Sequence, residues 1–168
     1  MRADVIVLCY HAVSDRWRSS LAVTPPRLEA QVRSLLRRGY RPQTFTEAVR
    51  EPAARRVVVV TFDDAYRSVI SRAAPVLERL GVPGTVFAPT GFVGSGEPMS
   101  WPGIEEWLAT EHREELVPMD WEELRALAAR GWEVGSHTVR HPHLTSLDAT
   151  ALDRELRESR AACEGEMG

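Results

Sequence analysis

Residues 57–66, VVVVTFDDAY, constrain the fold more than any other stretch of this chain. A continuous apolar run rich in β-branched residues is typical of a strand buried on both faces, as in a parallel sheet covered by helices. Asp63 and Asp64 follow where such a strand would end. Adjacent carboxylates beside a buried strand are costly unless a cation or hydrogen bonds compensate them. The pair therefore either forms a turn or helix N-cap, or belongs to a site at the strand end.

A second segment, residues 132–144 (WEVGSHTVRHPHL), carries three of the five histidines. We expect a short strand to end near Ser136, so that His137 follows a strand end as Asp64 does. His137 and His141 are separated by three residues. That spacing commonly places two imidazoles on one metal ion, with a carboxylate completing the set. The segment therefore favours a metal site over isolated structural histidines.

Hydrophobic periodicity predicts that strands and helices alternate along the whole chain. The expected strands are 5–9, 57–62, 85–88 and a short segment ending near Ser136. The expected helices are 25–38, 46–50, 69–80 (interrupted by Pro75), 104–108, 121–131 and a last helix that Ser146 would cap. Strands that alternate with helices are joined by parallel crossovers, so the sequence predicts an α/β architecture.

Length and charge limit the classes of function. A chain of 168 residues with a net charge of −3 predicts one domain without a basic field for nucleic acid. No apolar run is long enough to span a membrane. The N-terminal segment MRADVIVLCYH lacks the apolar region and cleavage site of a signal peptide. Cys9 and Cys163 make no disulfide framework, so we expect a reducing, cytoplasmic location.

The motifs TFDDAY at 61–66 and SHTVRHPHL at 136–144 together resemble two motifs of the polysaccharide deacetylases, the NodB-homology group of carbohydrate esterases. The resemblance continues, in order, through Tyr10-His11, Arg38-Gly39-Tyr40 and the expected helix 121–131. It implies a partial or distorted (β/α) barrel of parallel strands. It also implies an enzyme that hydrolyses N-acetyl groups on a carbohydrate, so an N-acetylated glycan would be the substrate.

The resemblance further implies that Asp64, His137 and His141 hold a divalent metal ion, commonly zinc, and that Asp63 is the general base. These residue types suit that chemistry. Two imidazoles and one carboxylate leave open positions on a catalytic ion. Such an ion activates water, and a neighbouring unligated carboxylate can take the proton of that water. Cobalt, nickel or iron would also accept this ligand set.

The chain departs from the usual family pattern in two ways. The arginine-proline motif, the tryptophan motif and the late histidine that usually acts as the acid are not found. Residues 1–168 are therefore expected to be the N-terminal portion of an incomplete domain, for which an oligomer is possible. In a branch resembling biofilm-polymer deacetylases the acid is instead a histidine after the first strand, and we expect His11 to take this role. Ala65 stands where glycine is usual, which is acceptable unless the backbone needs a positive φ.

Two other interpretations stay open. One is a deacylase of a small non-sugar amide, which the lining of the Gly- and Pro-rich loop 89–103 would distinguish from a polymer deacetylase. Trp101, in that loop, is a candidate for contact with the substrate. The other is a non-catalytic fragment that binds metal or glycan, which the missing motifs favour and the set of Asp63, Asp64, His137 and His141 opposes.

Overall fold

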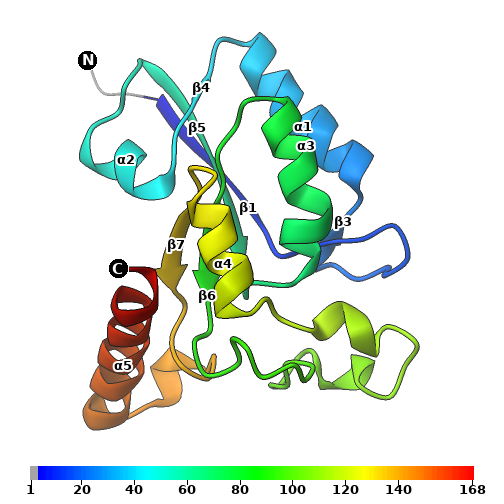
Figure 1. Cartoon of the computed structure of the whole chain (residues 1–168), viewed down its shortest axis with the longest axis vertical. Helices are drawn as coiled ribbons and strands as arrows, with labels where there is room; N and C mark the ends of the chain where they lie inside the picture. The colour runs from blue at the N-terminus through cyan, green and yellow to red at the C-terminus, as the bar shows by residue number, and fades with distance from the viewer. Residues whose placement is uncertain (1–3) are drawn as a thin grey trace.

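A computed structural model describes residues 4–168, which form a parallel sheet flanked by helices (Figure 1). The main sheet has five strands, in the order β1-β5-β6-β7, with β4 pairing β5 off this path. Its strands are β1 (Asp4–Tyr10), β4 (Arg41–Pro42), β5 (Arg56–Asp63), β6 (Thr85–Ala88) and β7 (Glu133–Ser136). All pairings are parallel. The predicted α/β class is therefore confirmed. The short strand β4 and a separate pair, β2 (Ala12–Val13) with β3 (Ala22–Val23), were not predicted.

Most helices begin where the sequence places their capping residues. The α-helices are α1 (Pro25–Arg37), α2 (Phe45–Arg50), α3 (Ala74–Arg79), α4 (Trp121–Ala128) and α5 (Ala149–Met167). Shorter turns are η1 (Val69–Ala73, a π-helix), η2 (Glu105–Trp107), η3 (Arg113–Leu116) and η4 (Leu144–Ser146). Asp120 forms the capping box that opens α4. The prediction that Ser146 caps the last helix is wrong, because Asp148 accepts from Ala151 N and begins α5.

Strand β5 lies at the centre and is buried on both faces. Val60 and Phe62 join the core beneath α1, α3 and α4, which lie in front of the sheet in Figure 1. Val57 and Val59 point to the other face and pack with Ala48 of α2. Each fully buried side chain of this size contributes about 1.5–3 kcal/mol. This two-sided burial explains the unbroken run of valines in the sequence.

The sheet is open rather than closed into a barrel, since β1 and β7 stand at the two ends of the strand order. On β1, Val5 and Val7 are 40% and 44% exposed. The open sheet is the partial barrel that the family resemblance implied.

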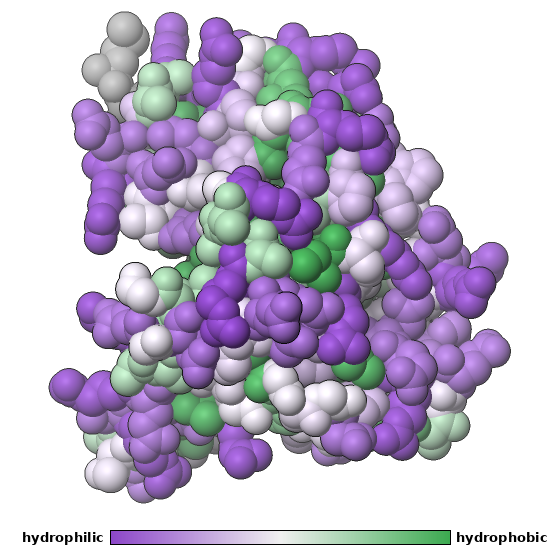
Figure 2. Space-filling model, in the orientation of Figure 1, coloured by the Kyte–Doolittle hydropathy of each residue, from purple (hydrophilic) through white to green (hydrophobic). Residues whose placement is uncertain are grey.

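The face shown in Figure 2 is mostly hydrophilic, with hydrophobic side chains gathered in small separate patches. Among residues 4–168 no helix is both long enough and apolar enough to cross a membrane.

Because the strands are parallel, their carboxyl ends lie along one edge of the sheet. The segments that follow β1, β5 and β7 carry His11, Asp64 and His137, and they meet at this edge. The chain turns sharply directly after β5. Asp64 and Ala65 have φ values of 68° and 52°, in the left-handed region. Ala65 therefore occupies a position that favours glycine, which explains why alanine is unusual in this motif.

Candidate metal and catalytic site

Asp64 is the centre of the site. It lies in the tight turn after β5, only 2% of its surface is exposed, and its Oδ1 atom has no hydrogen-bond partner among residues 4–168. A buried carboxylate oxygen without a partner is costly, because it has lost its water without gaining a donor. A cation bound beside this atom would compensate that loss.

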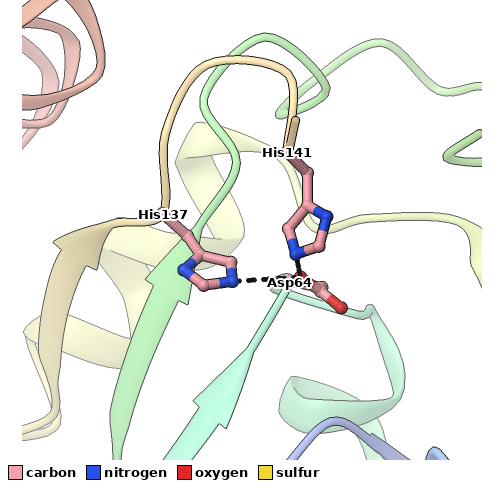
Figure 3. Close-up of side chains that lie close together, drawn as sticks. All are labelled: Asp64, His137 and His141. Atoms are coloured by element: carbon pink, nitrogen blue, oxygen red, sulfur yellow. Dashed lines mark ion pairs between the residues drawn. The ribbon is translucent and has the colours of Figure 1, made fainter. Parts of the chain in front are cut away.

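Two histidines point at that same oxygen (Figure 3). His137 is the first residue after β7, and its backbone N–H donates to the carbonyl of Ala88 at 2.8 Å. His141 follows in the next loop. The Nε2 atoms of His137 and His141 lie 3.5 and 3.4 Å from Asp64 Oδ1. The loop thus turns both rings toward one carboxylate.

The spacing of these three groups fits a tetrahedral metal ion. One ligand atom from each of Asp64, His137 and His141 lies within 4.8 Å of the others. Two ligands bound at about 2.0–2.1 Å to a tetrahedral ion are separated by roughly 3.3–3.4 Å, close to the distances from the imidazoles to the carboxylate. Two nitrogen ligands and one carboxylate oxygen are a common set for catalytic zinc. These residues can therefore hold a divalent ion and leave a coordination position open.

The electrostatics of the cluster also favour a cation. Burial and, after it, the neighbouring charge of Asp63 raise the pKa of Asp64 to about 7. Burial also lowers the pKa of His137 and of His141. Lowered histidine pKa values keep the imidazoles neutral, the form in which they bind metal. The carboxylate, in contrast, resists ionisation until a positive charge is placed beside it.

His11 and Asp63 flank the cluster. His11 Nε2 lies 4.0 Å from Oδ2 of Asp64, the oxygen that the other two histidines do not face. Burial lowers the pKa of His11, and the charge of Asp63 opposes this shift. Asp63, the last residue of β5, accepts a hydrogen bond from Cys9 Sγ at 3.4 Å. The structure therefore brings all five predicted polar site residues, and the strand carrying Cys9, to one edge of the sheet.

Trp101, the predicted substrate contact, lies against His141. It is only 8% exposed, and its ring stacks on His141 with centroids 4.4 Å apart and an interplanar angle of 26°. Phe92 packs edge-on against the Trp101 ring. The indole thus packs on the His141 ring, and its contact with a substrate stays a prediction. His143, two residues beyond His141, is exposed and lies outside the three-residue cluster.

Two residues near the site were missed in the sequence. The first is Cys9, which the parallel register pairs with Thr61 and so places on the same face as Asp63. Strand alternation could have predicted this. The second is Glu155 of α5, which is buried with Ser159 and Cys163 at intervals of four residues. A glutamate within the buried stripe of a helix was the available signal.

Comparison with known proteins agrees with this geometry. Residues 50–168 match the family model described as polysaccharide deacetylase. The YxkH protein of Bacillus subtilis (strain 168), which carries a polysaccharide deacetylase name, is 27% identical over 164 residues, covering 94% of this chain and 50% of that protein. The poly-β-1,6-N-acetyl-D-glucosamine N-deacetylase of Escherichia coli (strain K12) is 29% identical over 146 residues, covering 79% of this chain and 20% of that protein.

The solved structure of IcaB from Ammonifex degensii has the same fold, with a TM-score of 0.72 at 27% identity, covering 99% of this chain and 71% of that chain. The chain spans half the length of the B. subtilis relative and a fifth of the E. coli one. The family model, however, covers more than half of this chain and includes Asp63, Asp64 and both loop histidines. On this match, and with the fold and the grouping of these side chains in agreement, the chain belongs to the polysaccharide deacetylase family.

Proposed function

We propose that this chain carries the metal-binding and proton-transfer groups of a hydrolase that removes N-acetyl groups from an N-acetylated glycan. Membership of the polysaccharide deacetylase family supports the reaction type. The name of the E. coli relative, which specifies a polymer of N-acetylglucosamine, supports the class of substrate. The chain spans only part of the length of its relatives, so the activity proposed here rests on the residues of its own site.

One observation carries the proposal. Asp64 Oδ1 is buried, has no hydrogen-bond partner among the described residues, and lies 3.4–3.5 Å from two imidazole nitrogens. We assign Asp64, His137 and His141 as the ligands of a divalent ion, zinc being the first choice. When bound, such an ion lowers the pKa of a water molecule and polarises the amide carbonyl of the substrate.

Asp63 is assigned as the general base. It neighbours the ligand Asp64, yet consecutive residues at the end of a strand direct their side chains differently. Its only side-chain hydrogen bond among residues 4–168 comes from a thiol at 3.4 Å. A thiol is a weak donor, so the carboxylate keeps the acceptor capacity needed to take a proton from the attacking water.

His11 is assigned as the group that protonates the departing amine nitrogen. It approaches the cluster from the end of β1, beside the second oxygen of Asp64, at 4.0 Å. Burial lowers its pKa and the charge of Asp63 opposes this shift, and the role of acid belongs to the imidazolium form. The imidazolium gives its proton to the nitrogen as the C–N bond breaks, and His11 is left neutral.

The test is acetate release from an oligomer of β-1,6-linked N-acetylglucosamine, followed with and without a chelator. We expect release by the zinc-loaded protein, loss of release with chelator, and recovery when zinc is added back. Acetylated aminoalkanes of the same concentration serve as the small-amide control. Release from the small amide alone would favour a deacylase of non-sugar amides. A protein that holds one zinc per chain and releases no acetate from either compound would contradict the proposed activity.

A further inference from the structure

The loop that carries the two histidines is fixed by a carboxylate from a different part of the chain. Glu155, in the second turn of α5, accepts hydrogen bonds from the backbone N–H groups of Val139 and Arg140 at 2.8 and 3.0 Å. Both bonds end on the same oxygen, Oε2. Consecutive backbone N–H groups that converge on one point form an anion site. The ligand of this site is supplied by the protein itself.

This loop has a conformation that its residues do not favour. Thr138 and His141 have φ values of 67° and 55°, and neither is glycine. Non-glycine residues keep left-handed φ values only where surrounding contacts impose them. Within the loop, Thr138 Oγ1 accepts from the N–H of His141 at 2.9 Å. His141 therefore depends on the shape of the loop for the direction of its ring.

The other side of the loop rests on the segment after β6. The N–H groups of Thr90 and Gly91 donate to the carbonyls of Thr138 and Val139 at 3.0 and 2.8 Å. Here the loop supplies the acceptors, and its donors at Val139 and Arg140 are satisfied instead by Glu155 of α5. Glu155 is only 9% exposed, and its carboxylate is directed at the loop and not at solvent. The two bonds are charge-assisted, which makes them stronger than neutral ones.

We propose that Glu155 is a positioning residue for metal binding: it holds loop 137–141 in the left-handed conformation that directs His137 and His141 at Asp64. The inference rests on the proposed function, since it concerns the same metal. It also gives α5 a role in the site, although no residue of this helix belongs to the metal cluster. Because Val139 is half-buried and Arg140 is exposed, water can reach the freed N–H groups. Loss of the carboxylate should then loosen the loop without unfolding the domain.

The experiment measures the affinity for zinc of metal-free protein by competition with a chromophoric chelator, together with the visible spectrum of the cobalt(II) form. The variants are Glu155→Ala, Glu155→Gln and Glu155→Asp. Glu158→Ala is the matched control, because Glu158 lies one turn away on the same helix and is exposed. Circular dichroism verifies that each variant is folded.

Glu155→Ala should bind zinc about 10- to 100-fold more weakly, as when other groups that orient metal ligands are removed, and the cobalt bands should shift. Glu155→Gln keeps an oxygen acceptor and should recover part of the affinity. Glu155→Asp, which withdraws the carboxylate by one methylene, should also lose affinity and decides the matter if the alanine variant does not fold. Glu158→Ala should bind as the wild type does.

Wild-type affinity and an unchanged cobalt spectrum in Glu155→Ala, or wild-type affinity in Glu155→Asp where the alanine variant fails to fold, would refute the positioning role. His141→Ala, which removes a proposed ligand, is titrated in the same series. If it loses zinc binding while the Glu155 variants keep it, the role of Glu155 fails and the proposed function stands. If His141→Ala itself kept the affinity of the wild type, the proposed function would fail and the role of Glu155 would fail with it. The two results are distinguishable in one series of titrations.

Discussion

Replacing Asp64 by asparagine should stabilise the metal-free protein at alkaline pH while it abolishes metal binding. In the absence of metal the Asp64 side chain is buried, and its Oδ1 atom has no hydrogen-bond partner among the described residues. Ionising it there is unfavourable. Asparagine has nearly the same shape, carries no charge, and offers N–H donors to the imidazole nitrogens 3.4–3.5 Å away. The metal-free fold should therefore prefer the amide.

The size of the effect follows from the pKa of this group. Burial and the charge of Asp63 raise the folded-state pKa of Asp64 to about 7, against about 3.9 in an unfolded chain. The folded state therefore binds this proton more tightly. Stability from Asp64 is fully present below pH 4 and is lost as pH rises through 7. Between pH 5 and pH 8 the wild type should lose roughly 2–3 kcal/mol that the asparagine variant keeps.

The assay is urea denaturation of both proteins in excess chelator at pH 5, 6, 7 and 8. Histidines away from Asp64 titrate alike in both proteins, so their contribution cancels in the difference. The free energy of unfolding of Asp64→Asn minus that of the wild type should rise from pH 5 to pH 7 and level off toward pH 8. A difference that does not change with pH would refute the claim that the buried carboxylate is destabilised by ionisation.

Three further substitutions separate the proposed roles. Asp63→Asn should keep the zinc content of the wild type by elemental analysis and lower kcat by about 10²–10⁴-fold, the range for loss of a general base. Equal loss of metal in Asp63→Asn and Asp64→Asn would instead mean that both residues are ligands. His11→Ala should bind metal and fold as the wild type does, yet lose the basic limb of the pH–rate profile. The rate should fall less for an activated aryl acetate than for an N-acetyl sugar. An unchanged basic limb would assign the acid to another residue. His143→Ala should leave zinc occupancy and rate unchanged, and a loss of bound zinc would make His143 a ligand.

The sheet and most of the site could be predicted because they depend on regular features of the sequence. The valine run and strand alternation placed β5, and parallel topology then brought the ends of β1, β5 and β7 together. The spacing of His137 and His141 indicated a shared ligand, and their rings do turn toward one carboxylate. Residues that follow regular strands are thus located by topology alone.

Features that depend on irregular backbone or on tertiary contacts could not be predicted. Ser146 and Asp148 are both good N-cap residues two positions apart, so propensity does not choose between them. Trp101 lies in a loop without periodicity, and only the fold stacks it on His141. The left-handed φ of Ala65 is imposed by the turn around the site, against the local preference of alanine.

The most direct test of the central claim is the zinc content of the wild type, His137→Ala and His141→Ala after identical zinc loading and desalting. Elemental analysis should find about one zinc per chain in the wild type and only background in both variants, because neither leaves enough ligands for tight binding. Circular dichroism should show all three proteins folded. Wild-type zinc content in either folded variant would contradict a site formed by Asp64, His137 and His141.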